Sequence, residues 1–170
     1  MASRGRVGSN PTPGAIGVSK TYRGMLMSLH EKSCGAVVFK RSEELQYLLL
    51  HYEAGHWDYV KGQVEQHETE KETVVRELQE ETGIDDAHFI EGFREEINYV
   101  YRREARTVYK EVIFFLIESK QSNVRLSYEH VGYEWLNYEK AMARLTFQNA
   151  KKVLAKAHEF LRKHEKSQPS

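Results

Sequence analysis

Residues 62–84 constrain this chain more than any other stretch, because a capping pattern, two glycines and a run of glutamates all fit one short helix. Thr69 and Glu72 form the T-x-x-E pattern of a capping box, which predicts that the helix begins at about Glu70. Gly83 supplies the left-handed residue that commonly follows the last helical turn. An adjacent apolar sector is expected to anchor the helix to a core; it comprises Val74, Val75 and Leu78.

Three glutamates of this helix fall on one stripe. At about 100° per residue, Glu77 and Glu81 lie one turn apart, and Glu80 lies about 60° to the other side of Glu77. Such carboxylates repel one another unless a cation lies among them, and Mg²⁺ is bound by a few carboxylates together with substrate phosphates. We therefore predict a Mg²⁺ site, with Mn²⁺ as an alternative ion, to which the backbone carbonyl of Gly62 also contributes. The alternative, a solvated acidic face, is disfavoured because the spacing and both caps agree.

Two further residues of the stretch are expected to support this site. Glu68 and Arg76 lie about two helical turns apart, so they can pair with each other or with nearby backbone and hold the preceding loop against the helix. Together with Gly83 they are predicted to be structural supports, and not metal ligands.

The whole stretch fits one extended pattern, G-x5-E-x7-R-E-U-x-E-E-x-G-U with U aliphatic, at every specified position. These positions are Gly62, Glu68, Arg76, Glu77, Leu78, Glu80, Glu81, Gly83 and Ile84. In this pattern the chain resembles the Nudix hydrolases, which cleave nucleoside diphosphates linked to another group. The resemblance implies the Nudix fold, an α/β/α sandwich with a mixed β-sheet between helices.

The order of apolar and polar runs favours the same α/β class. Two β-rich runs, 34–40 and 46–52, are joined by a polar turn and predict a hairpin. The run 106–118 is apolar on both faces near its end, as in a central strand covered by helices on both sides. The remaining predicted elements are a strand and loop at 57–66, strands at 88–102 and 131–136, and helices at about 138–143 and 147–164.

The composition narrows the classes of function. The 170 residues suffice for one good core, and 25 Lys and Arg balance 25 Asp and Glu. This neutral charge disfavours binding of duplex nucleic acid or of an anionic membrane, and no run approaches the ~18 apolar residues that span a bilayer. The single Cys34, in an apolar run, indicates a buried thiol and no disulfide framework. We expect a cytoplasmic monomer without membrane attachment or an obligate protein partner.

The two ends of the chain differ from its middle. Residues 1–24 are rich in Gly, Ser, Pro and Arg and lack the apolar region of a secretory signal. We expect them to be a disordered leader or an expression-derived tail, with an organellar transit peptide as the alternative. Residues 25–165 are expected to form a single Nudix domain, and residues 166–170 a disordered C-terminal tail.

From Cys34 to about Lys163 the chain is similar to one group within the family, the asymmetric diadenosine tetraphosphate hydrolases of animal and archaeal type. The residues that carry this resemblance are Gly55-His56-Trp57, Glu91-Gly92-Phe93, Ile97-Asn98-Tyr99-Val100, Leu126-Ser127-Tyr128-Glu129-His130, Tyr133-Glu134-Trp135-Leu136, Phe147-Gln148-Asn149-Ala150-Lys151 and His158-Glu159-Phe160-Leu161. The chain departs from that group at Val60, Gln63 and His67, where proline, histidine and glycine are usual. These departures bear on substrate choice, because none removes a predicted metal ligand.

The resemblance implies particular roles in binding a dinucleoside polyphosphate, whose flat bases and phosphate chain require aromatic faces and cations. Tyr99 and Tyr133 match positions that stack on adenine, although half-buried strand tyrosines are an ordinary alternative. His56, Lys61 and Lys110 match positions that contact the phosphates.

The predicted reaction is metal-assisted hydrolysis of a phosphoanhydride, which would release ATP and AMP from diadenosine tetraphosphate. Glu80 is the first candidate for the general base, since it borders the metal stripe, and Glu111 is the second. Three alternatives stay open: a pyrophosphohydrolase acting on 5′-triphosphate RNA ends, a hydrolase of ADP-ribose or nucleoside triphosphates, and a non-catalytic nucleotide sensor. The sensor is disfavoured because all four box glutamates are present.

Overall fold

A computed structural model describes residues 17–18 and 28–166, so nearly all of the predicted leader and tail lie outside the described residues. The elements, in chain order, are β1 (Gly17–Val18), β2 (Leu29–Arg41), β3 (Leu45–Tyr52), β4 (Trp57–Asp58), β5 (Val60–Gln63), α1 (Glu70–Thr82), β6 (His88–Arg103), β7 (Arg106–Glu118), β8 (His130–Leu136), α2 (Tyr138–Arg144) and α3 (Gln148–Lys166). Every strand and helix predicted between residues 34 and 164 is present.

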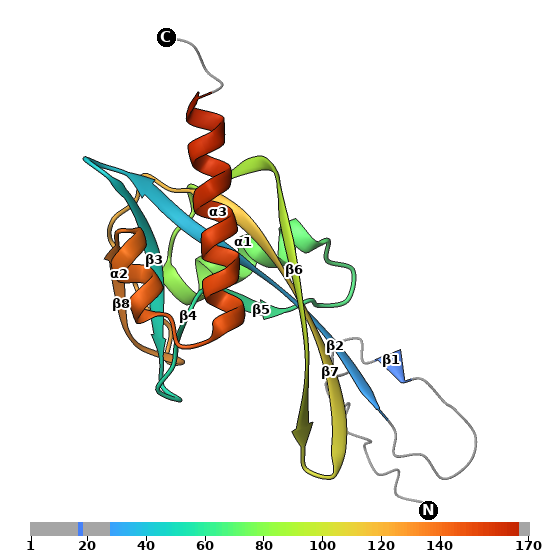
Figure 1. Ribbon diagram of the computed structural model, residues 1–170. Helices are drawn as coiled ribbons and strands as arrows, with labels where there is room; N and C mark the ends of the chain where they lie inside the picture. The colour runs from blue at the N-terminus through green and yellow to red at the C-terminus, as the bar shows by residue number, and fades with distance from the viewer. Residues whose placement is uncertain (1–16, 19–27, 167–170) are drawn as a thin grey trace, which may run out of the picture.

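The strands form one mixed, eight-stranded sheet (Figure 1). Its main path runs in the order β4-β3-β2-β7-β6, while β1 and β5 also pair with β2, and β8 pairs with β3. The pairing of β2 with β7 is parallel, and the other pairings are antiparallel. Strand β7 therefore lies inside the sheet between β2 and β6, as its sequence predicts.

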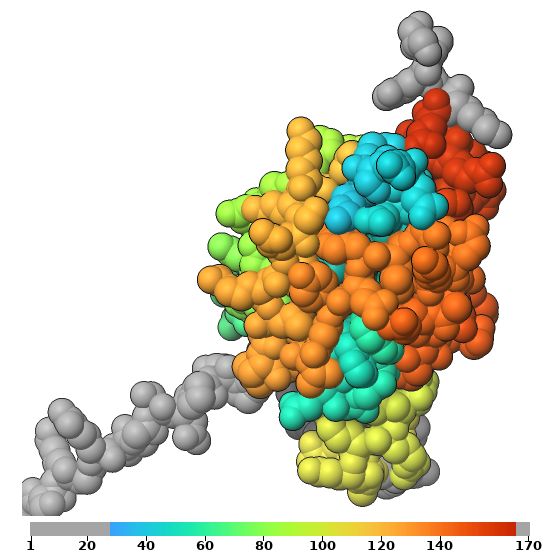
Figure 2. All heavy atoms as spheres, turned by 90° about the vertical axis from the view of Figure 1, so that its left-hand side faces the viewer, coloured from blue at the N-terminus to red at the C-terminus, as the bar shows by residue number. Residues whose placement is uncertain are grey.

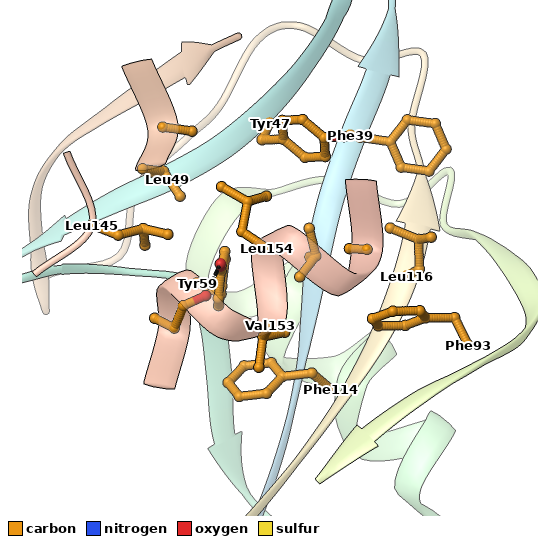
Figure 3. Close-up of a cluster of buried hydrophobic side chains, with 14 of the residues drawn as sticks. Phe39, Tyr47, Leu49, Tyr59, Phe93, Phe114, Leu116, Leu145, Val153 and Leu154 are labelled. Atoms are coloured by element: carbon orange, nitrogen blue, oxygen red, sulfur yellow. Dashed lines mark hydrogen bonds between the residues drawn. The ribbon is translucent and has the colours of Figure 1, made fainter. Parts of the chain in front are cut away.

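Helices cover both faces of this sheet. Alternate residues of β7 enter two separate cores: Val112, Phe114 and Leu116 belong to a core that includes residues of α3. Figure 3 shows this core, with Phe114 and Leu116 near Val153 and Leu154. The intervening residues Ile113, Phe115 and Ile117 belong to the core that includes residues of α1. The predicted arrangement of a mixed sheet between helices is thus confirmed.

Both predicted caps fix helix α1. The Thr69 hydroxyl accepts a hydrogen bond from the Glu72 N–H at 3.3 Å, and the Glu72 carboxylate accepts one from the Thr69 N–H at 2.8 Å. Gly83 has φ 71° and donates its N–H to the Gln79 carbonyl at 2.9 Å. Val74 and Leu78 are fully buried against the sheet, but Val75, which was expected to help anchor the helix, is 44% exposed.

The β6–β7 hairpin extends beyond the body of the domain. Its tip, drawn in yellow in Figure 2, projects beyond the rest of the described surface. A tight turn at residues 103–105 joins the strands, and Glu104 there has φ 55°.

Cys34 is completely buried, as predicted. None of the helices in residues 28–166 is both long and apolar enough to cross a membrane.

Gly35 allows β5 to lie close to β2. In the antiparallel register Gly35 faces Lys61, and a Cβ atom on Gly35 would lie 2.4 Å from the Val60 carbonyl oxygen and 2.6 Å from the Lys61 Cβ. Both contacts are with backbone or with the first side-chain atom, so neither can move away easily. The close approach of the two strands places Lys61 and Gly62 where the next section describes them.

We therefore expect Gly35→Ala to lower the free energy of unfolding by about 1–3 kcal/mol, as overpacked sites typically do. Urea denaturation followed by circular dichroism measures this change. Gly132→Ala is the matched control, since its Cβ would meet only the His51 Cβ at 3.6 Å, an ordinary contact. Equal stability of the two variants would contradict this reading of the β2–β5 contact.

Candidate active site

Three segments meet at the C-terminal half of α1: strand β5, the end of β3 and the loop before β8. Main-chain hydrogen bonds fasten this loop to the helix, since the Ser127 N–H donates to the Glu81 carbonyl at 3.2 Å and the Arg125 N–H donates to the Thr82 carbonyl at 2.8 Å. The Glu53 N–H, just after β3, donates to the Glu129 carbonyl at 2.9 Å. These bonds bring residues 125–130 next to Glu81.

Arg76 organises the start of the site. Its Nε lies 2.6 Å from the Glu68 carboxylate, and its Nη2 donates to the same carboxylate and to the Gln63 carbonyl, both at 3.0 Å. Its Nη1 lies 2.6 Å from Glu77 and 3.3 Å from Glu80. The guanidinium lowers the pKa of Glu68 to about 2. The pairing of Glu68 with Arg76 that the spacing predicts is therefore present, and it also holds the loop backbone.

Glu77 packs directly against Gly62. A Cβ atom on Gly62 would lie 1.8 Å from the Glu77 Oε1, so any larger residue would displace the carboxylate. The absence of a side chain thus leaves the backbone of β5 exposed to the Glu77 carboxylate. This arrangement agrees with the predicted contribution of Gly62, whose carbonyl is the oxygen that the sequence assigns to the metal site.

Glu81 is an almost fully buried carboxyl group without a cationic partner in contact. Its residue is 4% exposed, and burial, together with the nearby Glu77 and Glu129, raises the pKa of Glu81 to about 8. Its Oε2 accepts no hydrogen bond from any described residue. Burial also raises the pKa of Glu77, against the effect of Arg76. Buried carboxylates that repel one another are the donor set that a hard divalent cation would fill.

Glu129 completes this group, although the sequence did not single it out as a site residue. Its charge raises the pKa of both Glu77 and Glu81, which places it near both. As they stand, the His, Cys, Asp and Glu side chains of the described residues include no cluster of three that closes around one point. Glu77 instead bonds to Arg76, so cation binding requires a local rearrangement of side chains.

The two candidates for the general base lie in different surroundings. The Glu80 side chain is 60% exposed at the rim of the site, beside Glu77 and within 3.3 Å of Arg76. Glu111 instead lies 3.2 Å from Lys32, whose ammonium binds Glu70 at 2.7 Å. Glu70 begins α1, about 10 Å of helix rise before Glu77. Glu111 therefore lies near the N-terminal end of α1, whereas Glu80 lies toward its C-terminal end.

A pocket of about 360 Å³ lies on the α3 face of the sheet. It brings together His56, Lys61 and Tyr99, as the resemblance implies, and adds Phe147, which precedes α3 and lies 5.3 Å from the His56 ring. Its apolar floor and remaining lining are Ile97, Val112, Phe114, Ala150, Asp58 and Asn149. The pocket therefore combines the aromatic rings of Tyr99, Phe114 and Phe147 with the Lys61 ammonium.

Tyr52 connects the pocket to the acidic group. Its ring stacks on His56 at 4.5 Å, lies 4.8 Å below the Lys61 ammonium, and meets His130 edge-on at 4.3 Å. The Lys61 ammonium also binds Asp58 at 2.8 Å. The positions of His56 and Lys61 are thus fixed by residues that the sequence did not mark as functional.

Two predicted substrate contacts do not line this pocket. Tyr133 pairs with Leu50, which packs in the core on the α1 face, whereas the pocket lies on the α3 face. Lys110 is a cross-strand neighbour of Tyr99, but its ammonium lies 3.3 Å from Glu31. Phe147, 48% exposed, provides the second aromatic surface that the sequence assigned to Tyr133.

The burial of Glu81 predicts how the stability of the folded protein depends on pH. Between the ordinary pKa of 4.5 and the raised value of about 8, folded Glu81 holds a proton that the unfolded chain has lost, so stability falls as pH rises. Burial lowers the pKa of His130 to about 4, and the resulting loss of stability occurs below the ordinary value of 6.5. Between pH 6.5 and pH 8 the loss of stability caused by Glu81 is therefore separate from the loss caused by His130, which occurs at lower pH.

We expect the metal-free protein, kept in a chelator, to become less stable from pH 6.5 to pH 8 in thermal unfolding. Glu81→Gln should flatten this part of the curve, because the amide does not titrate. If the variant keeps the slope of the wild type, another group is responsible.

Comparison with known proteins shows to which family the chain is similar. The sequence model of the NUDIX domain matches residues 29–157. A mouse protein named bis(5′-nucleosyl)-tetraphosphatase [asymmetrical] is 40% identical over 143 residues, which cover 76% of this chain and 95% of that relative. The relative of the same name from Caenorhabditis elegans is 28% identical over 134 residues, covering 76% of this chain and 96% of the relative.

Solved structures show the same fold. The C. elegans Ap4A hydrolase binary complex aligns with a TM-score of 0.66 and 24% identity, covering 78% of this chain and 98% of that chain. The Escherichia coli dihydroneopterin triphosphate pyrophosphohydrolase aligns with a TM-score of 0.60 and 20% identity, covering 74% and 92%. The predicted α/β/α fold is thereby confirmed, and the chain belongs to the NUDIX domain family.

Proposed function

We propose that this protein is a divalent-metal-dependent hydrolase that cleaves diadenosine tetraphosphate asymmetrically, to ATP and AMP. The observation that carries the proposal is the junction of a buried acidic group with an aromatic pocket through one short strand, β5. Lys61 of that strand lines the pocket, and the adjacent Gly62 lies against Glu77. The names of the mouse and C. elegans relatives support the choice of substrate.

The acidic group would hold Mg²⁺, or Mn²⁺ in its place, through Glu77, Glu81 and Glu129, with the carbonyl of Gly62. When bound, the metal supplies positive charge for the phosphates and lowers the pKa of a water molecule. Arg76 holds the main-chain carbonyl of Gln63 and keeps Glu77 beside this group, although Glu77 would have to turn from Arg76 to bind the ion. Metal binding also removes the reason for Glu81 to be protonated near neutral pH.

The pocket would bind one adenosine and the phosphates next to it. Tyr99 and Phe147 offer ring faces for stacking on the base. Such stacking does not depend on which base is bound, because every base has a flat face. Lys61 offers its ammonium to the phosphates at the mouth of the acidic group. His56, whose pKa is lowered by burial and by Lys61, would act as a neutral hydrogen-bonding group. Lys110 would reach the phosphates only after leaving Glu31.

Glu80 is the favoured general base. Each candidate lies near one cation, Glu80 at 3.3 Å from Arg76 and Glu111 at 3.2 Å from Lys32, but Glu80 is the more exposed of the two and lies beside Glu77. A base must lie within hydrogen-bond reach of the water that attacks the phosphorus, and Glu80 satisfies this requirement if that water lies among the box glutamates. The proton would pass to the Glu80 carboxylate and then to solvent.

The first test is a product analysis of diadenosine tetraphosphate by ion-exchange chromatography, with and without Mg²⁺. We expect ATP and AMP in equal amounts, formed only with metal. Glu81→Gln should reduce the rate by about a hundredfold or more, since a metal ligand stabilises transition-state charge. Glu91→Gln, on the exposed surface of β6 and paired with Lys71, is the control and should keep its rate.

Three other substrates belong in the same experiment. If diadenosine tetraphosphate stays intact while RNA with a 5′-triphosphate, ADP-ribose or a nucleoside triphosphate is hydrolysed, the acidic site stands and the proposed substrate is wrong. If none is hydrolysed but nucleotides bind, the protein is a sensor.

A second test concerns the aromatic pocket. Phe147→Leu and Tyr99→Leu should each raise the KM for diadenosine tetraphosphate by about tenfold, because a lost stacking contact typically costs ~1–3 kcal/mol. Tyr133→Leu distinguishes the two placements of the second aromatic residue: the structure predicts a KM close to that of the wild type. A large rise in KM for Tyr133→Leu together with a normal KM for Phe147→Leu would reject the pocket as the adenosine site. Initial-rate kinetics at saturating Mg²⁺ provide the measurement.

A further inference from the structure

Two buried polar atoms without hydrogen bonds face each other at the acidic group. They are the Glu81 Oε2 and the His130 Nε2, and they lie 3.8 Å apart. The side chain of His130 is completely buried and that of Glu81 is 5% exposed. Unsatisfied buried polar atoms are uncommon in folded proteins, and each such atom calls for a physical reason. At this separation a small movement of either side chain would bring the two atoms within hydrogen-bond distance.

The rest of the His130 imidazole is already fixed. Its Nδ1 lies 3.1 Å from the Ser127 hydroxyl, and the main-chain N–H of His130 donates to the Ser127 carbonyl at 3.2 Å. The edge of the ring lies against Tyr52, with the ring centres 4.3 Å apart. In the tautomer with the ring hydrogen on Nε2, the Ser127 hydroxyl donates to Nδ1 and the Nε2–H points at the Glu81 carboxylate. The imidazole is therefore oriented toward Glu81 before any ligand binds.

The position of His130 does not depend on its side chain alone. The loop that carries it is attached to the last turn of α1 through the Ser127 N–H and the Glu81 carbonyl, at 3.2 Å. The backbone therefore joins Ser127 to Glu81, and the imidazole that Ser127 contacts lies beside the Glu81 carboxylate.

We propose that His130 is a positioning residue for the Glu81 carboxylate, which it orients by donating its Nε2–H to one carboxylate oxygen while the other oxygen faces the metal. A shift of about 1 Å shortens the 3.8 Å separation to an ordinary hydrogen bond. Hydrogen bonds of this kind fix the orientation of metal-binding carboxylates and raise metal affinity. The inference rests on the proposed function, since it takes Glu81 as a metal ligand.

Two conservative variants separate this role from simple packing. His130→Gln places an amide N–H near the position of Nε2, within reach of Glu81. His130→Asn places its amide near the position of Nδ1, where it can contact Ser127 but cannot reach Glu81. Both variants keep a polar side chain of similar bulk, so a purely structural role predicts similar behaviour from both.

The measurement is the affinity for Mn²⁺ without substrate, from the electron paramagnetic resonance signal of the free ion. We expect His130→Asn to raise the Kd for Mn²⁺ by about tenfold, and His130→Gln by less than about threefold. His158→Asn is the control, because His158 also bonds a buried hydroxyl, that of Tyr47 at 2.7 Å, but lies at the α2–α3 side of the domain. Its Kd should equal that of the wild type.

The outcomes separate the two proposals. If Glu81→Gln binds Mn²⁺ as tightly as the wild type, Glu81 is not a ligand and the proposed metal site fails. If Glu81→Gln weakens binding while folded His130→Asn does not, or if the Gln and Asn variants weaken it equally, only the positioning role is rejected. If His130→Asn does not fold, Ser127→Ala decides: an unchanged Kd in that variant overturns the role, and a Kd raised severalfold supports it.

Discussion

The guanidinium of Arg76 is the interaction on which the rest of the site depends. It is bonded to the carboxylates of Glu68 and Glu77 and to the Gln63 carbonyl, so one side chain joins the helix, the loop before it and the end of β5. A half-buried Glu77 is tolerated because this cation partly offsets the cost of burial. Arginine suits the position, because its planar fork can serve several oxygens at fixed angles, which a lysine ammonium cannot do.

Strand β5, which Arg76 holds through the Gln63 carbonyl, contributes residues to both faces of the sheet. Successive residues of a strand point to opposite faces. Lys61 accordingly enters the pocket on the α3 face, whereas Gly62 meets Glu77 of α1 on the other face. A ligand held in the pocket can therefore extend past the edge of β5 to the acidic group without crossing the sheet. The close contact of β5 with β2, which Gly35 permits, keeps the two faces in this relation.

The sequence predicted what depends on local chemistry and failed where a distant neighbour decides. Helix α1 was bounded correctly because its caps lie within the chain segment that they terminate. Val75 was placed in the core by periodicity, which gives the direction of a side chain but not the width of the surface that covers it. Glu129 lies in a loop without periodicity and reaches Glu81 only through main-chain bonds of that loop. Tyr133 does not line the pocket because its register with Leu50, which no local pattern specifies, places it on the other face, and its role in binding substrate stays a prediction.

The three departures from the usual pattern fall where this framework can absorb them. Val60 is buried in the core beside α1 and pairs with Ala36, so this position lies in an ordinary strand where no proline is needed. Arg76 binds the main-chain carbonyl of Gln63, an interaction that does not depend on the side chain at that position. His67 adopts φ 71°, a conformation that costs a non-glycine residue on the order of 1 kcal/mol, next to the tightly held Glu68. None of the three changes therefore displaces the acidic group.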